Sequence, residues 1–421
     1  MSFQDIRKIR RGLSPEEIRL LGLIVLGIIL LLALNIFLAR ILPGGEWLYL
    51  RWSGTRAYLF EQIEPYSTTI AERVQHLVYG RNAFSSEYGY VLNDPFYIVL
   101  LYTPLALFPD FSLVRGLWMF LSEAALIGSV IFSIRLSEWE PPRWIYISLI
   151  VSAIFGYYSL QSLVSASPTI FLLFLYLSIL LALRSFNDEL AGALLFLVAY
   201  QWEVGAAFFL FILFASIASK RWRVLGGLGM SLFILLVVSF LAYPSWGLPY
   251  IRAVLSDWYR SVNLNLNSLI SFWFSNSRFP IAAWVAFLLG AIVFLETLGA
   301  LRSSFRRIFW VAVLSLAVTP LLGFAIFQSN YVVLLPALVL VTALVWERWH
   351  RRRALAAALV LTIALAAPFI VSIYNVTMNE RVYSDLLTLL PPVAAIVALY
   401  WMRWQAVRAS RPWIEQVGIR S

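Results

Sequence analysis

The sequence predicts an all-α, polytopic membrane protein: a helical bundle of about twelve spans with two long, partly helical loops on one face. The chain has 421 residues, of which 61% are hydrophobic and 13% are charged, whereas ordinary soluble domains contain about 25% charged residues. Apolar runs of about 20 residues, the length that crosses a bilayer, recur along the whole chain. Basic residues gather in short clusters beside these runs, as in membrane proteins of defined orientation.

The basic clusters predict the orientation of the chain. Cytoplasmic loops of membrane proteins carry an excess of Lys and Arg. We therefore expect both termini in the cytoplasm, an even number of spans and a location in the plasma membrane. The same clusters account for the net charge of +10 without nucleic acid as a partner. The clusters are 7–11 ("RKIRR"), 220–223 ("KRWR"), 302–307 ("RSSFRR"), 348–353 ("RWHRRR") and Arg403, Arg408 and Arg411.

Two of the predicted spans have an alternative interpretation. The segment 95–109 is short and contains Pro95, Pro104 and Pro109, so a re-entrant or interfacial segment is an alternative to a span. The segment 190–219 is long enough for one tilted helix or for two half-helices broken at "YQWEVG". The predicted spans are 18–42, 95–109, 113–134, 144–160, 167–184, 190–219, 222–243, 280–300, 308–327, 330–347, 353–374 and 385–402.

Several kinds of site are excluded by composition. The sequence has no cysteine and only two histidines, so we expect neither a disulfide nor a metal site. It has no Gly-rich phosphate-binding loop, so we expect no nucleotide-sugar site. We expect no cofactor. Membrane lipids are the surroundings that such a composition requires.

The two long loops, 43–94 and 244–279, carry more cations than an outer face usually does. Guanidinium groups bind phosphate oxygens in pairs of hydrogen bonds, so an anionic partner such as a lipid-linked phosphate is one explanation. The alternative is that these arginines pair with loop acids or touch lipid headgroups. The arginines are Arg51, Arg56, Arg73, Arg81, Arg252, Arg260 and Arg278, and the acids are Glu61, Glu64, Glu72, Glu87 and Asp257.

Three acids, Glu46, Glu203 and Asp94, are candidates for a specific role. Glu46 follows the first span and the helix-ending "PGG", where a carboxylate is available as a base unless it is only a solvated loop acid. Glu203 lies in an apolar segment, and ionisable groups at membrane depth usually face a cavity or a partner. Asp94 precedes an apolar run, where it is a candidate helix cap or a ligand for the acceptor. We expect Glu296 to reach water near a helix end, with no functional role.

Four stretches resemble one family of membrane enzymes. The stretch "GGEWLYLRWSGTRAYLFEQIEPY" resembles the first outer loop of C-type glycosyltransferases (the GT-C fold), especially glycosyltransferase family 87; Pro65 and Tyr66 match the Pro-Tyr that ends its short helix. The stretch "NDPFYIVLLYTPLALFPDFSLVRGLW" is similar to the family's second and third spans, and "AGALLFLVAYQWEVGAAFFLFILFASIASKRWR" to its sixth. The stretch "NLNLNSLISFWF" is similar to the Asn-rich loop after its seventh span.

The resemblance implies a seven-helix module in residues 1–279, which includes both long loops, followed by variable helices in 280–421. It implies an outward-facing cavity and a polyprenyl-phosphate sugar as donor, and it puts Glu46 at the family's catalytic position. We expect the donor phosphate to be bound by Arg51, Arg56, Arg252 and Arg260, and the substrates by Tyr66, Asp94, Gln201, Glu203, Asn265 and Asn267.

The sequence differs from the family pattern at two places. The family's acid after the first span is usually Asp, and this chain has Glu46. The family's Lys-Pro in the sixth span is replaced by Gln201 and Trp202, which removes a cation near the donor phosphate. Either an outer-loop arginine substitutes for that lysine, or the donor differs, or activity is lost.

The expected reaction is the transfer of mannose, or of another hexose or pentose, to a lipid or glycan acceptor on the outer face. Two alternatives belong to other classes of protein. A transporter of lipids or solutes would use intramembrane polar residues such as Glu203 and Gln161. A non-catalytic relative would serve as a subunit of a larger membrane assembly.

Overall fold

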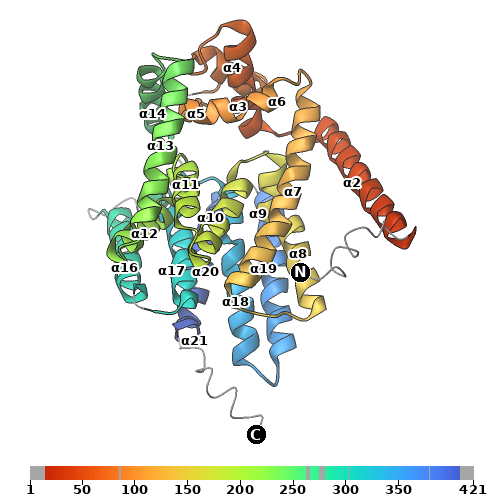
Figure 1. Ribbon diagram of the computed structural model, residues 1–421, viewed down its shortest axis with the longest axis vertical. Coiled ribbons are helices and arrows are strands. Elements are labelled where there is room, and N and C mark those ends of the chain that lie inside the picture. The colour runs from red at the N-terminus through yellow and green to blue at the C-terminus, as the bar shows by residue number, and fades with distance from the viewer. Residues whose placement is uncertain are drawn as a thin grey trace, which may run out of the picture.

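The computed structural model describes residues 15–84, 87–261, 266–274, 280–301, 303–378 and 380–407, without the side chains of Pro15 and of residues 259–261. These residues form an all-helical bundle that carries a cap at one end (Figure 1), and no strand occurs among them. The cap consists of residues 43–110, which include four short helices, together with α14. The cap helices are α3 (Glu46–Arg56, continued by η1, Ala57–Glu61), α4 (Thr68–Tyr79), α5 (Phe96–Leu101), α6 (Thr103–Ala106) and α14 (Gly247–Ser261).

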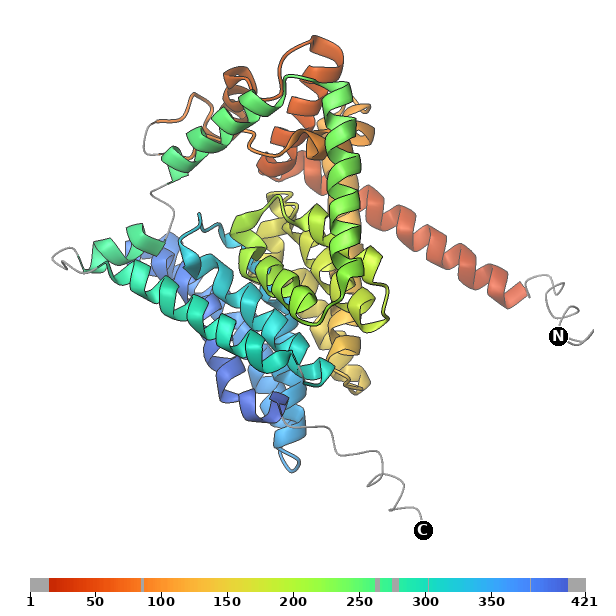
Figure 2. The same ribbon diagram turned by 60° about the vertical axis from the view of Figure 1, so that its left-hand side comes forward.

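The remaining helices form the bundle and short elements at its two ends, with α2 leaning away from the bundle (Figures 1 and 2). They are α2 (Pro15–Ile41), α7 (Phe111–Leu136), α8 (Arg143–Phe155), α9 (Tyr157–Val164), α10 (Thr169–Arg184), α11 (Asp188–Val198), α12 (Trp202–Ala218), α13 (Trp222–Ala242), α15 (Leu266–Trp273), α16 (Ile281–Ala300), α17 (Phe305–Val318), η3 (Thr319–Leu322), η4 (Gln328–Leu334), α18 (Leu335–Arg348), α19 (Arg353–Met378), α20 (Arg381–Trp401) and α21 (Arg403–Val407).

The polytopic class is confirmed, whereas the count of twelve spans is not. Among the described residues, eight helices are long and apolar enough to cross a membrane, or nine if α8 and α9, which are bent by 43°, form one span. The segment predicted as a span at 95–109 contains the short helices α5 and α6 instead, and both belong to the cap. Pro104 lacks the N–H that a continuous helix needs, so it begins a new helix.

The segment 190–219 forms two half-helices, as one of the two interpretations predicted. Helix α11 ends at Val198 and α12 begins at Trp202, so the break falls within "AYQW". Both outer ends of this hairpin lie at the same end of the bundle, because Asp188 at the start of α11 pairs with Arg221 just after α12. The hairpin therefore enters and leaves on one side, and its tip, 199–201, lies inside the protein.

The hairpin is fixed by close contact between the backbones of α11 and α13. A Cβ atom added to Gly192 would lie 1.9 Å from the carbonyl oxygen of Val224, and one added to Gly227 would lie 2.1 Å from that of Glu189. Only glycine allows such an approach, as in membrane helix pairs with small residues at the contact. Gly192 belongs to the Ala-Gly pair that opens the predicted sixth span, and this pair thus has a packing role.

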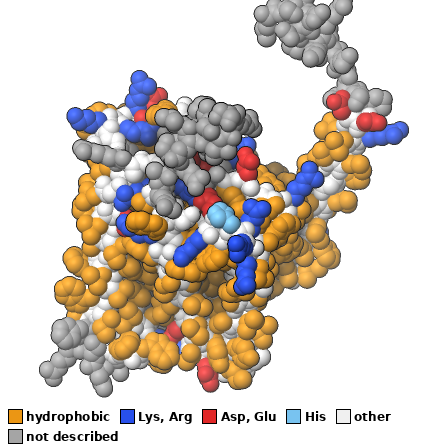
Figure 3. Space-filling view, turned by 90° about the horizontal axis from the view of Figure 1, so that it is seen from below, with side chains coloured by type: hydrophobic (Ala, Val, Ile, Leu, Met, Phe, Trp, Pro, Cys, Tyr) orange, Lys and Arg blue, Asp and Glu red, His pale blue; other side chains and the backbone are white. Residues whose placement is uncertain are grey.

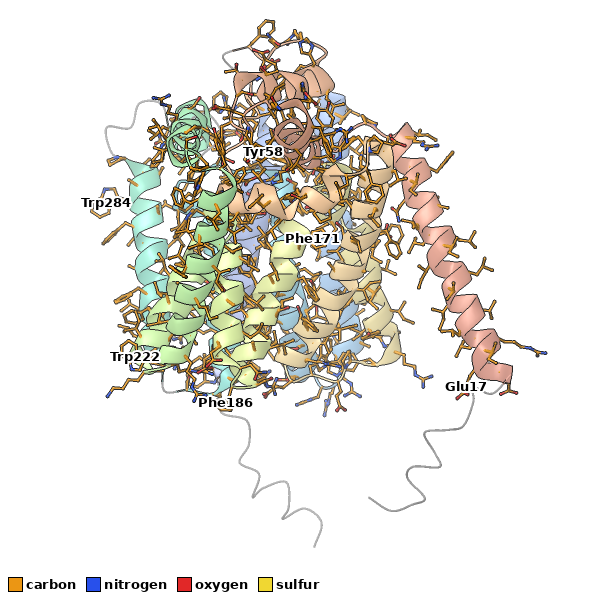
Figure 4. All side chains as sticks on the ribbon, turned by 45° about the horizontal axis from the view of Figure 1, so that its top comes forward. Glu17, Tyr58, Phe171, Phe186, Trp222 and Trp284 are labelled. Atoms are coloured by element: carbon orange, nitrogen blue, oxygen red, sulfur yellow. The ribbon has the colours of Figure 1, made fainter. Side chains whose placement is uncertain are left out.

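The end of the bundle opposite the cap, here called the basic end, is held by ion pairs between neighbouring helices. Arg184 pairs with Glu138 at 2.8 Å, and Arg306 pairs with Glu347 at 2.6 Å. Figure 3 shows Lys and Arg side chains gathered on this face, and Figure 4 shows Phe186 and Trp222 at the same end, opposite Tyr58 in the cap. Charged linkers at one end of an apolar bundle are typical of a multi-pass membrane protein.

Glu296 also belongs to the basic end, and the prediction that it reaches water was wrong. Its side chain is buried and accepts hydrogen bonds from Arg403, with Arg307 at 3.6 Å. A buried carboxylate needs such partners, because an unpaired charge in an apolar bundle is strongly destabilising. The pair joins α16 to the C-terminal end of α20.

The glycine contacts give a stability prediction with matched controls. Gly192→Ala and Gly227→Ala force α11 and α13 apart, and we expect each change to lower the free energy of unfolding by about 1–3 kcal/mol. The measurement is the temperature at which the detergent-solubilised protein loses its monodisperse elution peak.

The controls are Gly226→Ala and Gly229→Ala, which lie in α13 like Gly227. At both positions an added Cβ meets nothing within 4 Å. These changes should leave the melting temperature equal or slightly higher, since alanine favours helix. Equal melting temperatures for all four variants would contradict the proposed role of the glycine contacts.

Candidate functional site

Glu46 lies at the start of α3, directly after a tight turn. Helix α2 ends at Ile41, and Gly44 and Gly45 follow with φ angles of 114° and 88°, which residues with a side chain rarely adopt. The prediction that "PGG" ends the helix and turns the chain is confirmed. The turn places Glu46 at the first position of α3, with its side chain half-buried.

Arg115 of α7 holds this turn in place. Its guanidinium donates hydrogen bonds to the carbonyl oxygens of Ala39, Leu42, Pro43 and Val164, at 3.2, 2.6, 2.9 and 2.8 Å. The arginine is only 3% exposed. It therefore supplies donors to carbonyl groups that the end of α2 and the end of α9 leave without helical partners. No other side chain among those described contacts both segments in this way.

The environment of Glu46 raises the pKa of its carboxyl group. Burial is the main cause, because it disfavours the charged form. The backbone N–H of Glu46 and the positive charge of Arg115 act in the opposite direction and lower the pKa. A carboxylate with a raised pKa is a stronger base than an exposed glutamate.

Aromatic rings form a wall beside Glu46. Trp47 contacts the rings of Tyr88, Tyr90 and Phe327, with centroids 5.8, 5.7 and 4.9 Å apart. Tyr90 also lies within electrostatic range of Glu46. Because Phe327 comes from the segment before η4, the wall joins the cap to the bundle. Such rings offer an apolar surface for a sugar or an isoprenoid chain.

Arg51 and Asp94 form a buried ion pair behind this wall. The Nε and Nη2 atoms of Arg51 lie 2.8 and 3.0 Å from the two carboxylate oxygens, and Nη1 donates to the carbonyl of Trp47. Arg51 is 3% exposed and Asp94 is 2% exposed. The hydroxyl of Tyr66 donates to the backbone carbonyl of Asp94. Two N–H groups of Arg51 remain for another partner.

The structure corrects the capping role predicted for Asp94. Helix α5 begins at Phe96 with Pro95 in the capping position, and no side chain caps it. The carboxylate of Asp94 faces Arg51 instead, 43 residues away in the sequence. A buried guanidinium requires an anionic partner more strongly than an α-helix requires a side-chain cap.

The tip of the α11–α12 hairpin lies against the same ion pair. Glu203, in the first turn of α12, is within electrostatic range of Arg51, Asp94 and Asp257. Asp257 on α14 accepts hydrogen bonds from the Tyr88 hydroxyl at 2.9 Å and from the Asn93 amide at 2.8 Å. The fold thus brings Glu46, Arg51, Tyr66, Asp94, Gln201 and Glu203 to the junction of cap and bundle.

The other predicted residues lie apart from this junction. Arg56 donates to the carbonyl of Ala106 and lies over the rings of Trp52 and Phe60. Arg252 is exposed on α14, and it makes no hydrogen bond or ion pair with the residues that the structure describes. Asn267 is exposed on α15. The side chain of Arg260, as well as Asn265 and Arg278, lies outside the described residues.

Two loop arginines are explained by pairing with acids. Arg73 binds Glu61 with two hydrogen bonds, at 3.2 and 2.6 Å, and Arg81 binds Glu87 in the same way. For these two positions, the alternative that loop arginines pair with loop acids is confirmed. Both pairs lie on the surface of the cap, where such contacts add little stability.

Three residues of this junction, Arg115, Tyr88 and Tyr90, were not predicted from the sequence. Arg115 stands in an apolar helix near its cap end, and an arginine at that depth is itself a signal of a specific partner. Tyr88 and Tyr90 carried no signal beyond the preference of tyrosine for membrane interfaces. Their role depends on contacts with Asp257 and Trp47, which no local pattern reveals.

Comparison with known proteins gives a match to a family model that covers less than half of the chain. Residues 92–279 match the profile of glycosyltransferase family 87. No curated protein and no solved structure matches the chain. The matched segment contains Asp94, Arg115 and Glu203 but not Glu46, whose turn is held by side-chain and backbone atoms of that segment. Residues 92–279 of this multi-pass membrane protein thus resemble glycosyltransferase family 87, which supports a membrane glycosyltransferase.

Proposed function

We propose that the protein transfers a sugar, mannose or another hexose or pentose, from a polyprenyl-phosphate donor to a lipid or glycan acceptor. The reaction is a single displacement at the extracytoplasmic side of the plasma membrane, and Glu46 is the general base. The observation that carries this proposal is the environment of Glu46: a half-buried carboxylate with a raised pKa, fixed by Arg115 beside an aromatic wall.

In this reaction Glu46 takes the proton from the acceptor hydroxyl. The hydroxyl oxygen attacks the anomeric carbon, and the bond between that carbon and the phosphate oxygen breaks. The polyprenyl phosphate leaves with the bonding electron pair, so negative charge grows on a group that needs cations or N–H donors nearby. Both substrates are confined to the membrane surface, which raises the frequency of productive encounters.

Arg252 and Arg56 are the best candidates among the described arginines for contact with the leaving phosphate. Arg252 is exposed and has no acid partner among the described residues, and Arg56 is engaged only with rings and one carbonyl oxygen. Arg51 has two free N–H groups but is tied to Asp94. We therefore assign Arg51 a positioning role: its charge is balanced by Asp94, and the pair lies against the hairpin tip.

The first prediction concerns the base itself. Glu46→Gln keeps the shape and removes the basic oxygen, so turnover should fall by about a hundredfold or more. In the wild-type protein, activity should decline as the pH falls, with an inflection above the ordinary carboxyl value of 4.5, because burial raises the pKa of Glu46. The measurement is the rate of sugar transfer from a polyprenyl-phosphate donor in detergent across a range of pH. Full turnover in the glutamine variant would remove Glu46 from the role.

The second prediction separates the charge of Arg115 from its hydrogen bonds. Arg115→Gln removes a charge that lowers the pKa of Glu46, so the acidic inflection should move to higher pH. Arg115→Lys keeps the charge but cannot bond all four carbonyl groups, so turnover should fall while the inflection stays in place. Identical pH profiles in the two variants would contradict the coupling between Arg115 and Glu46.

The third prediction concerns the side of the membrane. The natural chain has no cysteine, so single cysteines report their position cleanly. In intact cells, a membrane-impermeant maleimide should label Glu72→Cys on α4 of the cap and should label Lys220→Cys at the basic end only after the membrane is opened. Both residues are exposed in the protein. The reverse labelling pattern would put the site on the cytoplasmic side.

A further inference from the structure

The tip of the α11–α12 hairpin is a polar break inside an apolar bundle. Helix ends leave carbonyl and N–H groups without helical partners, and in a membrane such a break is tolerated only inside protein or beside a water-filled space. Gln201 is 7% exposed at this break, and Glu203, two residues later, is half-buried. The tip therefore presents polar groups at the junction of cap and bundle.

Three side chains with acceptor oxygens lie around the tip. The Oε1 atom of Gln201 has no hydrogen-bond partner among the described residues, although it is buried. Glu203 forms no ion pair with them and bonds only its own backbone N–H. Asp257 adds a third acceptor group in electrostatic range of Glu203. A buried acceptor without a donor costs free energy, so a site built in this way favours a ligand that brings donors.

Tyr176 gives independent support from a neighbouring helix. Its hydroxyl is fully buried, has no hydrogen-bond partner among the described residues and lies within electrostatic range of Glu203. The hydroxyl occupies the place where a Cβ of residue 205 would lie, which explains why Gly205 stands there with φ −144° and ψ 23°, outside the helical range. The hydroxyl, the kinked first turn of α12 and Glu203 thus face one another.

We propose that the hairpin tip is the subsite for the sugar ring of the donor, in which Glu203 and the Oε1 atom of Gln201 accept hydrogen bonds from its hydroxyl groups. This inference rests on the proposed function. A sugar ring is neutral and rich in hydroxyl donors, which matches a pocket of acceptors. A phosphate group would meet the carboxylates of Glu203 and Asp257 at close range, so it lies outside this subsite.

The proposal makes Glu203 a determinant of sugar specificity. A site that hydrogen-bonds a substrate hydroxyl binds an analogue without that hydroxyl much more weakly, because the buried acceptor then has no hydrogen-bond donor. A hydrogen bond to a charged acceptor is stronger than one between neutral groups. Removal of the sugar hydroxyl that faces Glu203 should therefore lower kcat/KM by about 10- to 100-fold in the wild-type protein.

The experiment compares Glu203→Gln with wild type on a series of polyprenyl-phosphate hexoses, each lacking one hydroxyl group. We expect wild type to reject one deoxy donor and Glu203→Gln to lose most of that discrimination, mainly through a higher KM for the complete donor. Glu189→Gln is the matched control, because it is an exposed acid at the other end of the same hairpin. It should keep the wild-type pattern.

The outcomes separate the two proposals. If wild type transfers no sugar from any polyprenyl-phosphate donor, the proposed function and this inference both fall. If wild type transfers sugar and Glu203→Gln rejects the same deoxy donor to the same degree, the subsite is wrong and the proposed function stands. If Glu203→Gln does not elute as a monodisperse protein, Gln201→Leu takes its place. We expect Gln201→Leu to lose most of the discrimination against the deoxy donor. Unchanged discrimination in this variant would overturn the inference.

Discussion

The buried guanidinium of Arg115 is the interaction on which the candidate site depends. It bonds carbonyl oxygens of residues 39–43, which end α2 and begin the following turn, and of Val164 at the end of α9, so one side chain of α7 joins two segments that are distant in sequence. Each carbonyl is a group that a helix end leaves without a partner, and in apolar surroundings such a group needs a donor. The position of Glu46 follows, because the residue comes directly after this turn. Cap and bundle also meet through the Trp47 and Phe327 rings, and through hydrogen bonds from the Trp47 N–H to the Ser165 carbonyl and from the Tyr58 hydroxyl to the Ala242 carbonyl.

The same constraint explains the hairpin. Two half-helices that enter and leave at the basic end bring backbone polar groups and Glu203 to the inner end of the cap without exposing them to lipid. This arrangement requires α11 and α13 to touch through Gly192 and Gly227. A side chain at either position would shift the hairpin, and with it the distance between Glu203 and the ion pair of Arg51 and Asp94. The packing of small residues far from the cap therefore sets the geometry of the polar cluster.

Local sequence patterns predicted the fold class and most helix ends, because apolar runs, Pro and Gly act over a few residues. They indicated the turn at "PGG", and they marked 95–109 and "YQWEVG" as doubtful spans, where the structure has short cap helices and a hairpin. They could not predict which charges pair. Arg51 meets Asp94 from 43 residues away, and Glu296 meets Arg403 from 107 residues away. A pattern with a period of 3.6 residues contains no information about partners at that separation. For this reason the capping role expected for Asp94 and the contact with water expected for Glu296 were wrong.

The distribution of charge around the candidate site favours one orientation of the proposed donor. The acids near the hairpin tip, Glu203 and Asp257, lie inward of the cap surface, whereas Arg252 is exposed on α14. A donor with a neutral ring and an anionic phosphate has its lowest electrostatic energy with the ring toward the acids and the phosphate toward the exposed cation. In the proposed reaction, the bond that breaks then lies between the region of the acids and that of the exposed cation. The loss of the family's lysine at Gln201 is then consistent with activity, because a cation at the tip would attract the phosphate into the place that the sugar requires.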